Sequence, residues 1–156
     1  MRKSYGFLSP FVTLITCVGL SAIILYRIED FFFRHRLLLI SYTFHRLNLV
    51  IHGIDILPGA TIGSGFRIEH PVGIVIGAKT VIGRNCTILQ NVTIGTRQIH
   101  ADAYDDKFPI IGDNVTIGCN STLLGGIEIQ NDVTIGAHTL VLANVPAGTT
   151  ITGLYK

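Results

Sequence analysis

Aliphatic residues recur at every sixth position along most of the chain. With two interruptions, the row consists of Ile62, Ile68, Ile76, Ile82, Ile88, Ile94, Ile111, Ile117, Leu123, Ile129, Ile135 and Val141. Helices repeat near 3.6 residues and strands at 2, so this period belongs to neither element alone. A six-residue period is typical of β-helices, in which each hexad forms one side of a prism.

The hexads also carry turn-forming residues at one fixed phase, three positions after the aliphatic residue. These positions hold residues that tolerate positive φ, namely Gly65, Asn85, Asn91, Asn114, Asn120, Gly126, Asp132 and Asn144. A sandwich of short strands would instead alternate at period 2 with irregular loop lengths. A single hexad cannot bury its aliphatic residue, so the core forms only when coils stack. The pattern predicts a mainly β fold, a parallel β-helix of about five coils over residues 53–156.

Residues 1–52 follow no hexad, and we expect them to form a separate helical segment with helices at about 11–33 and 37–50. The run from Ser4 to Tyr26 contains no charged residue and has basic residues on both sides, so its length alone satisfies the criterion for a membrane span. Pro10 and two glycines inside the run favour helices that pack on the prism or touch a membrane peripherally. No small-residue cleavage site indicates a signal peptide.

The chain of 156 residues carries a net charge of +2. Residues 1–50 contain six Lys/Arg and two Asp/Glu, whereas the rest of the chain contains six Lys/Arg and eight Asp/Glu. The net positive charge of the whole chain is too small to indicate a nucleic-acid partner. Cys17, Cys86 and Cys119 lie far apart without metal-binding spacing. We therefore expect reduced thiols, no metal, and a cytoplasmic protein, with membrane association as an alternative.

Two interruptions of the hexad row are the expected places for chemistry, because native sequences break their own local rules mostly at functional sites. The first, "HPVGIV", lengthens one interval to eight residues and directly follows Glu69. The second, "TRQIHADAYDDKFP" at residues 96–109, lengthens another to seventeen. Loops that project from a rigid scaffold commonly carry binding and catalytic residues.

Two stretches carry a family resemblance, "GIDILPGATIGSGFRIEHPVGIVIGAKTVIGRNCTILQNVTIG" and "IIGDNVTIGCNSTLLGGIEIQNDVTIGAHTLVLANVPAGTTITG". The sequence resembles the left-handed β-helix acyltransferases and, among them, serine acetyltransferases. Asp55, the acidic–His pair at 69 and 70, and "GIVIG" make the resemblance specific. It implies a left-handed prism, acetyl-CoA-dependent transfer to a hydroxyl, and a homotrimer with acetyl-CoA between neighbouring prisms.

The resemblance also implies roles for particular residues, with His70 as general base and Asp55 orienting its ring. Imidazole changes its protonation state near neutral pH, and a carboxylate on its other nitrogen fixes the tautomer. No Ser or Cys stands beside a His as a nucleophile, so we expect the acceptor hydroxyl to attack the thioester directly. A backbone N–H at Gly95 or Thr96 is the expected oxyanion donor. Asp55 and His70 are fifteen residues apart, so stacking alone does not bring them together.

Cofactor contacts are expected on the last coils, where small residues would let the pantetheine chain approach the backbone. The residues that match are Gly118, Cys119, Gly136 and Ala137, and the expected phosphate partners are Lys156 and Arg97. His138 sits at the turn position of its hexad, where backbone geometry favours His, and its role is expected to be structural.

The second loop departs from the serine acetyltransferases, which carry an Arg–His pair before the proline that corresponds to Pro109. Here the pair reads Lys107 and Phe108. This difference favours a sugar or polysaccharide hydroxyl as acceptor, bound by residues drawn from Glu69, His100, Tyr104, Lys107 and Phe108. Serine O-acetylation, with His100 replacing the missing histidine, is the alternative, and an inert β-helix scaffold is a further one.

Overall fold

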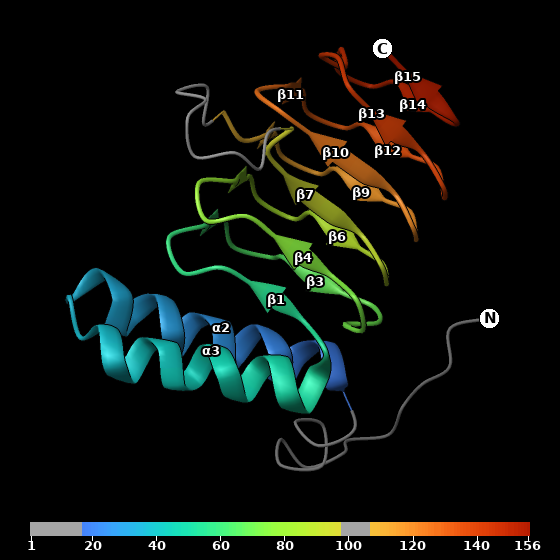
Figure 1. The fold of residues 1–156 in the computed structure, drawn as a ribbon. Helices are drawn as coiled ribbons and strands as arrows, with labels where there is room; N and C mark the ends of the chain where they lie inside the picture. The colour runs from blue at the N-terminus through green and yellow to red at the C-terminus, as the bar shows by residue number, and fades with distance from the viewer. Residues whose placement is uncertain (1–16, 98–106) are drawn as a thin grey trace.

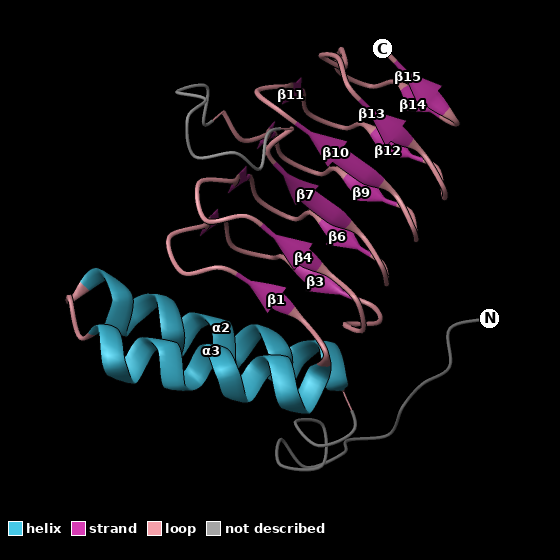
Figure 2. Ribbon diagram, in the orientation of Figure 1, coloured by secondary structure: helices cyan, strands magenta, loops and turns pink. Residues whose placement is uncertain are grey.

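The computed structural model describes residues 17–97 and 107–156. Two helices, α2 (Val18–Arg34) and α3 (Leu38–His52), precede a left-handed parallel β-helix whose first coil they cover (Figure 1). Figure 2 shows the same division, with all strands in the prism and both helices at its N-terminal end. The fold predicted from the hexads is therefore confirmed.

Each of the first four coils places one short strand on each of three parallel sheets. The first sheet contains β1 (Asp55–Ile56), β4 (Val75–Ile76), β7 (Thr93–Gly95), β10 (Thr122–Leu124), β13 (Leu140–Val141) and β15 (Leu154–Tyr155). The second contains β2 (Thr61–Ile62), β5 (Val81–Ile82), β8 (Ile110–Ile111) and β11 (Glu128–Ile129). The third contains β3 (Arg67–Ile68), β6 (Thr87–Ile88), β9 (Thr116–Ile117), β12 (Thr134–Ile135) and β14 (Thr150–Ile151).

The aliphatic row forms the core of the prism. All twelve of its members are buried. Aliphatic residues of neighbouring coils stack on one another, as where Ile88 pairs with Ile117. Residues of the row thus fill the interior along its whole length, as the period predicted. The three cysteines are unpaired, and Cys86 is buried beneath a turn, with burial raising the pKa of its thiol.

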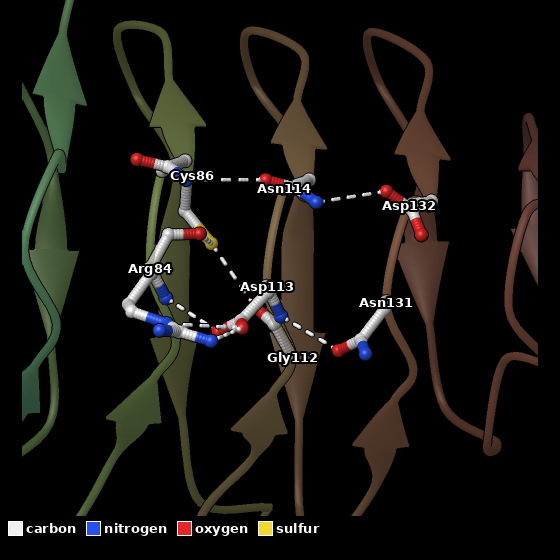
Figure 3. A network of polar contacts seen from close by, with 8 residues as sticks. Arg84, Cys86, Gly112, Asp113, Asn114, Asn131 and Asp132 are labelled. Atoms are coloured by element: carbon white, nitrogen blue, oxygen red, sulfur yellow. Dashed lines mark hydrogen bonds and ion pairs between the residues drawn. The ribbon is translucent and has the colours of Figure 1, made fainter.

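Turns with left-handed backbone separate the strands at the expected phase in most hexads. Asn85, Asn114 and Asp132 have φ near 58–59° and form a ladder, in which the Asn114 amide donates to Asp132 at 2.9 Å (Figure 3). The prediction was wrong for Gly126 and Asn144. At the former turn the positive φ belongs to Gly125, whereas the Asn144 side chain accepts a hydrogen bond from the Glu128 N–H.

A second ladder runs beside the first on the same turns (Figure 3). The Arg84 N–H donates to Asp113 at 2.7 Å and the Asp113 N–H donates to Asn131 at 2.8 Å, while the Arg84 side chain adds an ion pair of 2.9 Å to Asp113. The backbone N–H and guanidinium of Arg84 hold the pKa of the Asp113 carboxyl below its usual range. These contacts join three successive coils.

The helices are fastened to the first coil by side chains of α2. The Tyr26 hydroxyl donates to Ala60 O at 2.8 Å, and the Arg27 guanidinium donates to Ile62 O and Gly63 O. Gly19 lies so close to the Ile68 carbonyl that a Cβ would not fit. The helices therefore cover the N-terminal end of the prism, where the first strand of each sheet would otherwise lack a neighbour.

The expected helices are present with shifted bounds. The first begins at Val18 within the described residues, since 11–16 lie outside them, and the second runs two residues past 50 to His52. Gly53 then ends α3 with a left-handed φ of 66°. Within residues 17–97 and 107–156, no helix combines the length and apolar character needed to cross a membrane.

Candidate active site

The predicted site residues gather on two of the three edges of the prism. We call the edge between the third and first sheets the His70 edge; it comprises residues 69–74, 89–92, 118–121, 136–139 and 152–153. We call the edge between the first and second sheets the loop edge; its described residues are 57–60, 77–80, 96–97, 107–109, 125–127 and 142–144. The first interruption of the hexad row lies on the His70 edge, and the described ends of the second lie on the loop edge.

The His70 edge carries the expected general base and the small residues of the last coils. Glu69 and His70 are both exposed and follow β3 directly. Farther along the prism, Gly118 lies against the backbone of Gly136 and Ala137, where a Cβ would come within 2.6 Å of the Ala137 nitrogen. The His70 edge therefore offers an imidazole as a possible base and, on later coils, small residues that let a ligand approach the backbone closely.

The loop edge carries several of the other expected residues that the structure describes. A cavity of about 550 Å³ opens there, lined by Thr96, Arg97, Lys107, Gly125, Gly126, Ile127, Leu142, Ala143 and Asn144. The Arg97 guanidinium donates to the carbonyl of Leu142, which lines this cavity, and to the carbonyl of Leu124. Two cationic side chains therefore stand at one hollow, which suits an anionic ligand.

The remaining expected site residues either do not line this cavity or lie outside the residues that the structure describes. The Phe108 ring packs on Gly77 and leaves no room for a Cβ there. Gly95 ends β7 directly before the loop edge, with open space where a Cβ would point. Lys156 follows β15 at the far end of the prism and is exposed. His100 and Tyr104 fall in 98–106, outside the residues that the structure describes.

Asp55 and His70 approach the same edge from adjacent coils. Asp55 opens β1, and the segment that contains His70 stacks on the chain just before it, where the Gly73 N–H donates to Gly53 O at 2.8 Å. Among the described residues, no hydrogen bond or ion pair connects Asp55 with His70, and the partner of Asp55 is His45 at 3.4 Å. The predicted dyad therefore stays a prediction.

His45 and Glu29 are the polar residues near the site that the sequence did not indicate. Both are buried, at 7% and 0% exposure, and their side chains lie 3.6 Å apart. The sequence showed only that a His and an acid occur within largely apolar helices. Their spacing along the chain gave no reason to place them beside Asp55. In the part of the chain that the structure describes, no group of three His, Cys, Asp or Glu residues is arranged to hold a metal ion.

A β-helix built from hexads, with the expected site residues along its edges, is the architecture of a hexapeptide-repeat transferase. Residues 108–143 match the family model described as bacterial transferase hexapeptide (six repeats). The serine acetyltransferase of Helicobacter pylori is 36% identical over 135 residues, which are 86% of this chain and 77% of that protein. The chain therefore belongs to the serine acetyltransferase family.

Solved structures agree with this assignment. A Neisseria gonorrhoeae serine acetyltransferase in complex with serine is 31% identical with a TM-score of 0.84, over 97% of this chain and 61% of that one. A serine acetyltransferase in complex with CoA is 33% identical with a TM-score of 0.77, over 85% of this chain and 53% of that one. The chain spans 54% and 64% of the curated relatives from Synechococcus elongatus and Staphylococcus epidermidis.

These similarities bear on the acceptor. The Lys107–Phe108 pair favoured a sugar hydroxyl and left serine as the alternative. The relatives are serine acetyltransferases, one of them solved with serine bound, so the comparisons support the alternative better than the first choice.

Proposed function

We propose that this chain transfers the acetyl group of acetyl-CoA to the hydroxyl of L-serine. The observation that carries the proposal is family membership, joined to an exposed His70 beside an acidic residue on the edge where the hexad row breaks. The relatives solved with serine and with CoA support the two substrates. A scaffold without activity would not need either the acid–His pair or the cavity of the loop edge.

In the proposed reaction, the His70 imidazole removes the proton of the serine hydroxyl as its oxygen attacks the thioester carbonyl. The tetrahedral intermediate then collapses, the carbon–sulfur bond breaks, and the imidazolium returns the proton to the CoA thiolate. Asp55 supports this role if its carboxylate accepts the other ring N–H of His70. The backbone N–H of Gly95 is the proposed donor to the oxyanion, and Glu69 the proposed partner of the serine ammonium group.

We further propose that the site forms between copies of the chain in a homotrimer. The proposed base lies on the His70 edge, whereas Arg97 and Lys107 lie on the loop edge, across the first sheet of the same prism, and Gly95 directly precedes that edge at the end of β7. In a closed threefold arrangement, the His70 edge of one copy faces a different edge of its neighbour. Acetyl-CoA in that groove would meet Gly118 and Gly136 of one copy and the cationic cavity of the next.

The acceptor is tested by measuring thiol release from acetyl-CoA with L-serine, and with a panel of sugar nucleotides and oligosaccharides. The proposal expects turnover with serine well above that with any sugar. Turnover on a sugar with none on serine would overturn it and would point to Phe108 as a residue that stacks on the sugar ring. The variant Phe108→His, which restores the family's histidine, should then raise activity on serine.

A further inference from the structure

Three ionisable side chains meet beneath the proposed site, where the helices cover the first coil. Glu29 comes from α2, His45 from α3 and Asp55 from the start of β1. The His45 ring lies between the two acids, with Nδ1 3.6 Å from Glu29 Oε1 and Nε2 3.4 Å from Asp55 Oδ1. The cluster thus runs from the buried helix interface to the one acid proposed to act on His70.

The backbone fixes which nitrogen of His45 faces Asp55. Its Nδ1 lies 3.2 Å from the Ile56 carbonyl, which can only accept a hydrogen bond, so Nδ1 carries a hydrogen. The ring orientation then directs Nε2 toward Asp55 Oδ1. Asp55 Oδ1 is buried and has no hydrogen-bond partner among the described residues, so the 3.4 Å approach of His45 Nε2 is the close polar contact of this oxygen.

Glu29 lies on the other side of the ring and is fully buried. Neither of its carboxyl oxygens has a hydrogen-bond partner among the described residues. Burial, followed by the nearby Asp30 and Asp55, raises the pKa of Glu29 to about 8. At neutral pH it is therefore mostly uncharged and does not compete with Asp55 for the His45 ring.

Packing alone does not account for this cluster. The helices are already fastened to the prism by Tyr26 and Arg27, and to each other where the Asn48 amide donates to Ala22 O at 3.0 Å. A buried acid without a hydrogen bond lowers stability relative to an apolar residue of the same size. Residues that break the rules of burial in this way are expected near functional sites.

We propose that His45 is a positioning residue, which holds Oδ1 of Asp55 and leaves its other carboxylate oxygen free to orient the His70 ring. This inference rests on the proposed function, since it acts only through Asp55 and His70. Asp55 is about one-third exposed and lies at the first position of its strand, so without a partner its carboxylate could turn toward solvent. His45, 7% exposed and bonded to Ile56, supplies a rigid support.

The test compares His45→Leu and His45→Gln with a matched control, Ser41→Ala. Ser41 is buried on the same helix one turn away and donates to the Glu29 carbonyl at 3.1 Å, so its loss perturbs the interface without touching Asp55. His45→Leu should lower kcat by about 10- to 100-fold, as misplacement of a reacting group does, with the KM for acetyl-CoA unchanged. His45→Gln keeps an N–H donor and should retain more of kcat, and Ser41→Ala should retain nearly all of it.

A double-mutant cycle separates positioning from a structural role. In an Asp55→Asn background, His45→Leu should cause little further loss of kcat, because both changes remove the same orientation of His70. Losses that multiply, or a wild-type kcat in His45→Leu, would overturn the inference while the function stands. Wild-type protein that releases no thiol with any acceptor would overturn the proposed function instead, and the role of His45 with it.

Discussion

Ile117 in β9 stacks on Ile135 in β12, because the two strands pair in parallel register and both side chains are buried. Replacing Ile117 with Asp places an unpaired carboxylate in the centre of the prism, which costs several kcal/mol of stability. We expect Ile117→Asp to unfold the protein or to lower its melting temperature strongly. Thr116→Asp, on the outward position of the same strand, is the control and should melt close to wild type. Equal melting temperatures for the two variants would contradict the packing.

The turn ladder allows a second prediction. Asn114 has a φ of 59° and donates to Asp132 (Figure 3). Asn114→Ala loses this bond and leaves a side chain in the left-handed conformation without the local hydrogen bonding by which Asn tolerates it, so it should lower the free energy of unfolding by about 1–3 kcal/mol. Asn114→Gly loses the bond but tolerates the backbone and should cost less. Denaturant titration measures both, and a larger loss for Gly would contradict the prediction.

These two cases also show what the sequence could predict. Ile117 and Asn114 occupy fixed phases of a six-residue period, and stacking of coils converts each phase into one position in space, so core and turns follow from spacing. The expectation failed at Asn144, whose backbone is not left-handed and whose side chain instead accepts a hydrogen bond from the Glu128 N–H. His45 could not be linked to Asp55, because the approach of a helix to a prism depends on tertiary packing that no period encodes. The division of the site between two edges likewise needed the sheet topology.

Glu29 predicts how stability depends on pH. Its folded pKa of about 8 is raised from 4.5, so the folded protein binds this proton more tightly than the unfolded chain does. Its contribution to stability is fully present below about pH 4.5 and is lost as the pH rises through 8. The free energy of unfolding should therefore fall between pH 5 and 8 more steeply in wild type than in Glu29→Gln.

The exposed Glu128 provides the control for this measurement. Glu128→Gln should keep the wild-type slope over the same pH range, which denaturant titrations at several pH values would determine. A Glu29→Gln protein with an unchanged slope would show that Glu29 is ionised in the folded state.

The proposed threefold assembly predicts a trimer in solution. The proposed site is divided between the His70 edge and the loop edge, so in this proposal a monomer would lack one half of it. Sedimentation equilibrium of the full chain, 17.0 kDa per copy, should give three times that mass at micromolar concentration. A monomer with full thiol-release activity would contradict an active site shared between copies.

The central claim is that His70 is the general base for acetyl transfer to serine. His70→Ala should lower kcat for serine-dependent thiol release by about 10²- to 10⁴-fold, while acetyl-CoA still binds. Asp55→Asn should lower kcat less, because the ring is misoriented but still present. His35→Ala, an exposed histidine between the helices, is the control and should keep wild-type turnover.

The most direct measurement is therefore kcat for thiol release from acetyl-CoA with L-serine, compared between wild type and His70→Ala at matched acetyl-CoA occupancy. If His70 is the general base, wild type turns over readily and the variant loses at least about 100-fold. Equal turnover by the two proteins would contradict this role.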